Sequence, residues 1–182
     1  MKRLILIVIL TAISKMANAQ SIFQIFERAI EKHEKGDFFG AISDYNILIE
    51  LDATDGIYFL KRGLAKGQLH DHRGAIVDFN KAIELNSKFL EYSYEDAFLL
   101  INVVRDAYVS RAASKSLLGD VVGSIDDCNK ALGVDPKFAM AFYQKGIARY
   151  KLNELELACL DFSKAGELGY TSVYDIIKKY CQ

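Results

Sequence analysis

The sequence predicts an all-α fold built from stacked helical hairpins. The main observation is a pattern that returns after 34 positions, in which Ala41, Tyr45 and Leu48 recur as Ala75, Phe79 and Ala82. The same spacing relates Ser124, Cys128 and Ala131 to Ala158, Phe162 and Ala165. Apolar residues around these positions follow the helical period, and no strand-like alternation occurs. A period of this length is typical of repeat proteins, in which each unit packs against its neighbours.

Alignment on the small residue of the second helix gives four copies of the unit, 22–55, 56–89, 105–138 and 139–172. Each copy contains a first helix, a short turn and a second helix. We expect helices at 22–35 and 38–51, 56–69 and 72–85, 105–117 and 120–133, and 138–151 and 154–166. Two helices approach closely only where their side chains are small, so small residues of the first helix should face small residues of the second. These pairs are Ala29 with Ala41, Gly63 with Ala75, Ala112 with Ser124, and Gly146 with Ala158.

The turns inside the copies carry chain-breaking residues at matching positions. These are Gly36-Asp37, His70-Asp71-His72, Gly119-Asp120 and Asn153-Glu154. The single proline, Pro136, follows the expected end of a helix. The turn positions therefore support the same division into hairpins as the small residues do.

These residues resemble the tetratricopeptide repeat, a helix-turn-helix unit of the same length. The clearest matches are Phe59-Leu60-Lys61-Arg62-Gly63 with Gly74 to Leu85, Tyr143-Gln144-Lys145-Gly146 with Ala158 to Ala165, and Ala131-Leu132-Gly133-Val134-Asp135-Pro136. The resemblance implies an α-α superhelix of about four hairpins whose first helices line a concave groove. It also implies a capping helix at 173–182, with Val173, Ile176, Ile177 and Tyr180 on the face that covers the last repeat.

An insert at 90–104 interrupts the rhythm, because Ala75 and Ser124 are 49 residues apart. The insert either extends the first helix of the third copy or forms a separate short helix. Its apolar residues either pack internally as additional core or form a surface for a partner or a second copy. The residues of that alternative surface are Tyr92, Tyr94, Phe98, Leu99 and Val103.

The first 19 residues have the pattern of a secretory signal peptide. Lys2 and Arg3 precede an apolar stretch from Leu4 to Ile13, and Ala17-Asn18-Ala19 forms a cleavage site. The apolar stretch is too short to span a membrane, which needs about 20 residues. We therefore expect an exported protein, periplasmic or secreted, whose mature chain begins at Gln20.

Three cysteines remain in the mature chain, which would meet an oxidising compartment. Cys128 occupies a packing position and is expected to be a buried free thiol. Cys159 and Cys181 lie on the last two expected helices and can pair only if these helices bring their Cα atoms close enough. The sequence leaves that pairing open.

The composition excludes several classes of function. Removal of the signal peptide leaves 20 basic and 24 acidic residues, so electrostatics gives no support for binding nucleic acid. The chain has no phosphate-binding loop, dinucleotide glycine motif or serine nucleophile motif. His70, Asp71 and His72 are too few ligands for a closed metal site. We expect no enzyme activity, no metal and no cofactor.

The resemblance assigns a partner-binding groove to the first helices of the copies. The side chains that would line it are Phe23, Phe26, Ile30 and His33, then Ile57, Leu60 and Leu64, then Asp106, Val109 and Ala113, and finally Met140, Tyr143, Ile147 and Tyr150. Some of these, Leu64 and Ile147 in particular, could instead pack helix against helix. Family members that grip a C-terminal carboxylate use lysine and asparagine in the first helix, where this chain has Phe26 and Ile30.

The sequence therefore predicts a non-enzymatic scaffold or adaptor that binds a protein or peptide partner. The apolar lining favours a hydrophobic or amphipathic segment docked by apolar burial. The alternative is a structural protein of the cell envelope that associates with copies of itself.

Overall fold

A computed structural model describes residues 19–87 and 97–181 of the chain. Residues 1–18, which hold most of the expected signal peptide, lie outside the described residues, as do 88–96, which include 90–96 of the insert, and residue 182. The chain divides into two compact units, Met1–Thr54 and Asp55–Gln182. We refer to them as unit 1 and unit 2.

Unit 1 contains one described hairpin. Residues 19–34 are helical, and α2 follows over Phe38–Leu51. Ala29 and Ala41, the small residues expected at the helix crossing, are both fully buried, together with Tyr45 and Leu48. The hairpin thus has its core on the residues that carry the repeat.

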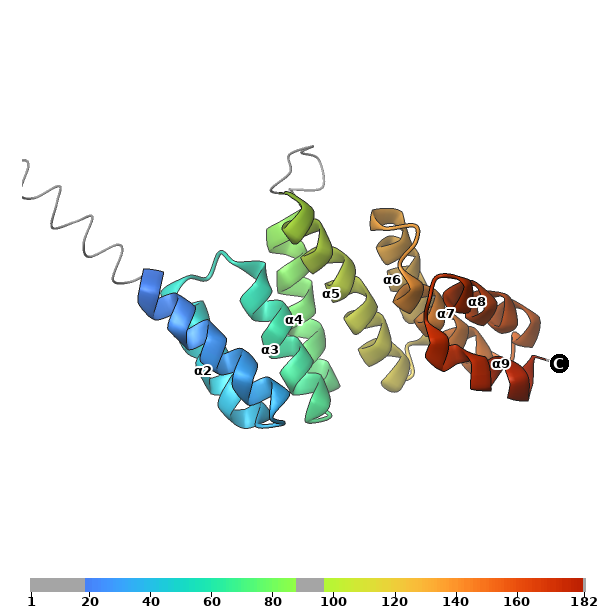
Figure 1. Ribbon diagram of the computed structural model, residues 1–182, viewed down its shortest axis with the longest axis horizontal. Helices are drawn as coiled ribbons and strands as arrows, with labels where there is room; N and C mark the ends of the chain where they lie inside the picture. The colour runs from blue at the N-terminus through green and yellow to red at the C-terminus, as the bar shows by residue number, and fades with distance from the viewer. Residues whose placement is uncertain (1–18, 88–96, 182) are drawn as a thin grey trace, which may run out of the picture. The chain divides into compact units, whose positions relative to one another are not determined.

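Unit 2 contains three hairpins followed by a short C-terminal segment (Figure 1). The hairpins are α3 (Gly56–Gln68) with α4 (His72–Ser87), α5 (Ala97–Leu117) with α6 (Val121–Val134), and α7 (Ala139–Lys151) with α8 (Leu155–Glu167). Each second helix also packs against the next first helix, α4 against α5 and α6 against α7. The described residues contain no strand, and none of their helices is long and apolar enough to cross a membrane.

The turns of the hairpins share one backbone design. The residue before each turn aspartate or glutamate has a positive φ, at Gly36, His70, Gly119 and Asn153. In the first three turns the following aspartate caps the second helix, since Asp37, Asp71 and Asp120 each accept a 2.9 Å hydrogen bond from a backbone N–H three residues on. The acceptor is the side-chain oxygen that a helix N-terminus requires. Asp71 is therefore a helix cap, which gives the His-Asp-His triplet a structural explanation.

Small residues let the two helices of a hairpin approach closely. A Cβ built on Gly63 would lie 2.7 Å from the Phe79 ring, and one on Gly146 would lie 2.6 Å from the Phe162 ring. These glycines belong to the predicted crossing pairs. The aromatic rings of α4 and α8 fill the space that the absent side chains leave, so the glycine and the aromatic residue together determine how close the helices pack.

A buried carboxylate joins the two helices of every described hairpin. Each aspartate of a second helix contacts two cations that lie four residues apart on the first helix. The groups are Asp44 with Arg28 and Lys32, Asp78 with Arg62 and Lys66, Asp127 with Arg111 and Lys115, and Asp161 with Lys145 and Arg149. We call this set the carboxylate ladder. The four aspartates are only 0–5% exposed, so their charges depend on these partners.

Two members of the ladder differ in their pKa. The side-chain hydrogen bond from Arg28 holds the pKa of Asp44 below its ordinary value, whereas burial raises the pKa of Asp161 despite Lys145 and Arg149. The stabilisation from Asp44 is therefore present above the ordinary carboxyl pKa and is lost as the pH falls through the lowered value. Because the pKa of Asp161 is raised, its contribution to stability is present below the ordinary carboxyl pKa and is lost as the pH rises through the raised value.

The second part of the insert, residues 97–104, belongs to the third hairpin. Helix α5 runs without interruption from Ala97 to Leu117, so 97–104 extend the first helix of the third copy. Val103 and Val104 are 4% and 0% exposed, and α5 packs against α3, α4, α6 and α7. This part of the insert therefore contributes to the core of unit 2.

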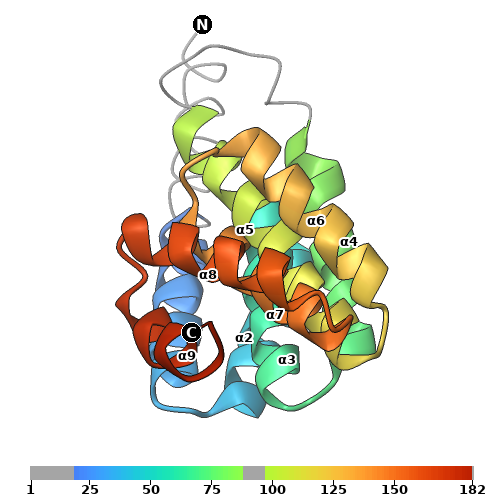
Figure 2. The same ribbon diagram turned by 90° about the vertical axis from the view of Figure 1, so that its right-hand side faces the viewer.

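The chain ends in a cap on the last hairpin. A short 3-10 helix, η2 (Thr171–Val173), leads into α9 (Tyr174–Tyr180), and both pack against α8 (Figure 2). Val173, Ile176 and Ile177 contact a cluster that includes Ala158 and Phe162. A disulfide joins Cys159 of α8 to Cys181, with the Cα atoms 5.5 Å apart. The sequence left this pairing open, and the antiparallel approach of α8 and α9 makes it possible.

We predict that Asp78→Asn strongly destabilises the protein. The substitution keeps the size of the side chain but leaves Arg62 and Lys66 without the buried carboxylate they contact at 2.6 and 2.8 Å. Loss of one partner from a buried charge group costs on the order of 3 kcal/mol. Asp126→Asn is the matched control, because Asp126 pairs with Lys130 at the surface with 58% of its side chain exposed. The control should change the unfolding free energy by less than about 0.5 kcal/mol. If denaturant titrations showed that Asp78→Asn and Asp126→Asn lower the unfolding free energy equally, the carboxylate ladder would not have the proposed role in stability.

Candidate functional site

The first helices of unit 2 line a hollow of about 390 Å³. We call it the groove. Most of its lining comes from α3, α5 and α7, and α4 adds two side chains. The lining residues are Gly63, Leu64, Gly67, Gln68, His72, Phe79, Val109, Ser110, Ala113, Ser114, Leu117, Met140 and Gln144.

Small residues on α3 and α5 open this hollow. Gly63 and Gly67 lie one helical turn apart, and Ala113 lies across from them on α5. A Cβ built on Gly67 would meet no atom within 4 Å, whereas one built on Gly63 would contact Phe79. Gly63 is therefore required for helix packing, and Gly67 leaves space that an incoming group can use.

The lining carries no aspartate, glutamate, lysine or arginine. Arg62, Lys115 and Arg149 of the same three helices bind the carboxylate ladder and do not line the groove. Helical periodicity thus separates one charged stripe of each first helix from one uncharged stripe. What remains in the groove is apolar surface with a few neutral hydrogen-bonding groups.

Those neutral groups can satisfy a peptide backbone. Gln68 and Gln144 each offer an amide donor and acceptor, and Ser110 offers a hydroxyl. Leu64, Met140 and the 63% exposed Leu117 supply apolar contact area. The arrangement suits an uncharged chain segment, in which side chains bury apolar surface and the backbone finds polar partners.

Among the residues predicted to line a groove in unit 2, Leu64, Val109, Ala113 and Met140 lie in this hollow. Leu60 does not, and it is buried with 4% of its surface exposed, while Ile57 is only half-buried. Tyr143 packs its ring 4.7 Å from that of Tyr170, measured between ring centroids.

Ile147 and Tyr150 line a second, smaller hollow of about 270 Å³ near the cap. Lys151, Phe162, Ile176 and Tyr180 complete it, so α9 forms one of its walls. The ring centroids of Tyr150 and Tyr180 are 5.3 Å apart, and Tyr150 remains 43% exposed. Of the groove residues predicted on α7, Met140 thus lines the groove, whereas Ile147 and Tyr150 line the second hollow.

The predicted groove residues of unit 1 have different environments. Phe23 is 63% exposed, whereas Phe26 and Ile30 are half-buried. The Phe26 ring lies 6.4 Å from that of Tyr45, centroid to centroid. Phe23 is therefore the one with free apolar surface.

The alternative surface on the insert is only partly described. Tyr92 and Tyr94 lie outside the described residues, and Phe98 and Leu99 belong to α5 without described side chains. Val103 is buried, with 4% of its surface exposed, so it offers little contact area to a partner.

Several lining residues were not identified from the sequence. Gly67, Gln68, Leu117 and Gln144 were missed because the prediction followed apolar residues and the family's pattern. Gly67 carried a usable signal, since it follows Gly63 by four residues on the same helical face. The ladder was missed too, although its aspartates Asp44 and Asp78 are 34 residues apart.

The part of the chain that the structure describes gives little support for a metal site or a reactive thiol. No three histidine, cysteine, aspartate or glutamate side chains gather there to hold a metal ion. Cys128 is fully buried, and burial, with a smaller effect from Asp127, raises the pKa of its thiol to about 12. A thiol with so high a pKa is a poor nucleophile at neutral pH.

No sequence-family model matches the chain. No curated protein matches it in sequence either.

Solved structures do match in three dimensions. MamA superposes with a TM-score of 0.68 at 20% sequence identity, covering 86% of this chain and 83% of that chain. The first tetratricopeptide repeat domain of Spaghetti (RPAP3), bound to the HSP90 peptide SRMEEVD, gives a TM-score of 0.62 at 19% identity and covers 74% and 94%. The tetratricopeptide repeat domain of Arabidopsis OM64 gives 0.60 at 18% identity and covers 74% and 98%.

These likenesses establish the fold. The chain has the all-α fold of tetratricopeptide repeat domains, as its sequence resemblance predicted. Identities of 18–20% are too low to carry a function from one protein to another. The function must therefore be argued from the groove.

We predict that the native protein hides its free thiol. Cys128 should not react with a disulfide reagent in the folded state, because its side chain is buried and its pKa is about 12. Unfolding without reductant should expose one thiol per chain, and unfolding after reduction should expose all three cysteines. A colorimetric thiol count under the three conditions checks both the burial and the disulfide. Three reactive thiols before reduction would contradict the pairing.

Proposed function

We propose that this protein is a binding module without catalytic activity, which holds a protein or peptide partner in the groove of unit 2. The observation that carries the proposal is the groove of about 390 Å³ along α3, α5 and α7, whose lining has no lysine, arginine, aspartate or glutamate. Its apolar residues and neutral amides fit a hydrophobic or amphipathic segment with its backbone partly exposed. The proposed role is that of a scaffold or adaptor.

Structural neighbours support peptide binding as the general role of such a groove. The first domain of RPAP3 is bound to an HSP90 peptide, and the second domain of human RPAP3 is in complex with the HSP70 peptide SGPTIEEVD. Both peptides have the acidic C-terminal sequence EEVD. The groove of this chain has no lysine or arginine in its lining, which argues for a segment without that acidic character.

We also propose that the protein is exported. The support is the basic, apolar and small-residue pattern of residues 1–19, together with a disulfide between Cys159 and Cys181. Disulfides persist mainly in oxidising compartments, so the crosslink is consistent with a periplasmic or secreted location.

The groove proposal predicts that Met140→Glu and Gly67→Leu weaken partner binding. Met140→Glu places a charge in apolar surroundings, and Gly67→Leu fills the hollow from a position where a Cβ meets no atom within 4 Å. We expect at least a roughly tenfold loss of affinity for each, since about 1.4 kcal/mol suffices for that change. The measurement is fluorescence anisotropy with peptides selected from a library tiled over the envelope proteins of the source organism.

Val122→Glu is the matched control for the groove variants. Val122 lies on α6, is 71% exposed and does not line the groove. The control should bind selected peptides like the wild type. Peptides that bind all three variants equally well would show that the groove is not the site.

The export proposal predicts a mature protein that begins at Gln20. Expression of the full chain in a Gram-negative host should place it in the periplasmic fraction with residues 1–19 removed. Peptide mass mapping of the N-terminus checks the cleavage site. Protein that keeps Met1 and stays in the cytoplasmic fraction would contradict export.

A further inference from the structure

The C-terminal cap occupies the place of another repeat helix. Within unit 2 every second helix packs against the first helix that follows it, α4 against α5 and α6 against α7. The second helix α8 packs in the same way against η2 and α9 (Figure 2). The face beneath the cap therefore continues the interface by which this chain stacks its own helices.

The cap covers that face with little material. Helix α9 has 7 residues, compared with 13 in α7 and 21 in α5. Ile176 and Ile177 pack against the core cluster of the last hairpin, and both remain half-exposed. A helix of this length is not stable by itself, so its position depends on packing and on the crosslink.

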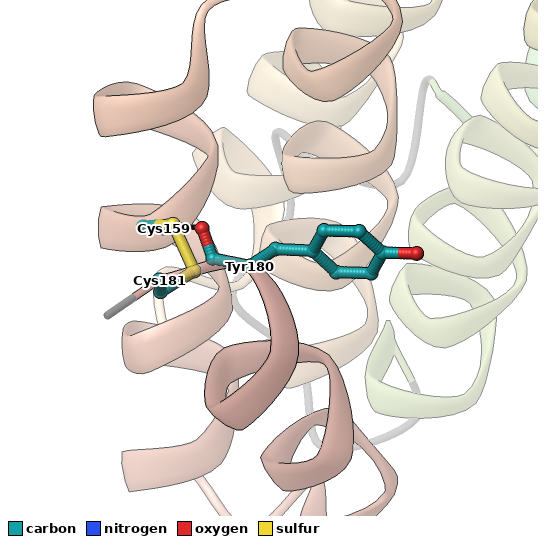
Figure 3. Close-up of a disulfide and its surroundings, with 3 residues drawn as sticks. All are labelled: Cys159, Tyr180 and Cys181. Carbon is teal, nitrogen blue, oxygen red and sulfur yellow. Dashed lines mark hydrogen bonds between the residues drawn. A yellow bond between two sulfur atoms is a disulfide. The ribbon is translucent and has the colours of Figure 1, made fainter.

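The disulfide fastens the free end of the cap. Cys181 follows α9 directly and is joined to Cys159 on α8, while the Tyr180 ring points away from the disulfide (Figure 3). That ring contacts Tyr150 and closes the smaller hollow against Ile147 and Phe162. At its other end the cap is held by the fully buried Val173 and by a 3.2 Å hydrogen bond from the Tyr174 hydroxyl to the Gly166 carbonyl.

Opening the disulfide would therefore release the end of α9, and this 7-residue helix would then be held mainly at its beginning, by Val173 and the Tyr174 hydrogen bond. Reduction by a dithiol converts the disulfide into two thiols, one on Cys159 and one on Cys181, and the dithiol becomes a cyclic disulfide. The residues that lose their cover are Ala158, Phe162 and Ile147.

We propose that the Cys159–Cys181 disulfide is a redox latch, and that reduction opens the end of the array for the first helix of a second copy. The helix over 19–34 suits this place, because it is a first helix of the same repeat and its Phe23 is 63% exposed. The contact is head to tail, so each added copy presents the same free end again. The latch is independent of the groove and of what the groove binds.

The first test is the exchange of backbone amides in α9. Hydrogen exchange followed by mass spectrometry compares the purified oxidised protein, the same protein with excess dithiol, and Cys159→Ser/Cys181→Ser. Loss of a crosslink over a loop of 22 residues favours local opening, so exchange should become about 10- to 100-fold faster in α9. Helix α4 is the internal control and should not change. Unchanged exchange in α9 of the reduced protein would overturn the proposal.

The second test is the mass in solution across a concentration series, measured by light scattering. The oxidised protein should remain one species, whereas the reduced protein and the double serine variant should grow in mass as the concentration rises. Phe23→Glu in the double serine background should restore the single species. Reduced protein that stays monomeric at every concentration overturns the proposal, as does growth that Phe23→Glu leaves unchanged.

Discussion

The buried carboxylate of each hairpin is the interaction on which the rest of this structure depends. Asp44, Asp78, Asp127 and Asp161 are nearly inaccessible to solvent, and each meets two cations from the partner helix. An unpaired charge in such a place is costly, so a shift of one helix along the other would be strongly disfavoured. The carboxylates thus hold the register in which small residues such as Gly63 and Gly146 meet the aromatic rings.

This register also explains the character of the groove. On α3, Arg62 and Lys66 contact Asp78, whereas Leu64, Gly67 and Gln68 line the groove. The same division on α5 and α7 leaves Val109, Ala113 and Met140 facing the hollow. The lysines and arginines that pair with the buried aspartates of α4, α6 and α8 are thus absent from the lining of the groove. The recognition chemistry proposed for the protein follows from the packing inside the repeats.

The interruption of the repeat is accommodated by a longer helix. Residues 97–104 lengthen α5 at its N-terminal end, and Val103 and Val104 belong to the core of unit 2. The packing of α4 against α5 is retained, so the extra residues do not break the sequence of helix contacts. Arg111 adds a hydrogen bond to Asn80 of α4, which ties the third hairpin to the second beyond apolar packing.

The sequence by itself determined the helices, the turns and the repeat, because these are local. At Gly36-Asp37 and Gly119-Asp120 the glycine follows the end of one helix and the aspartate caps the next, as the boundaries of α2 and α6 show. Only the tertiary structure decided which side chains meet. Leu60 and Leu64 lie one turn apart on α3, yet the first is buried and the second lines the groove. The pairing of Cys159 with Cys181 likewise required the approach of α8 and α9. Helical period places a residue on a face, but the crossing of two helices decides what that face touches.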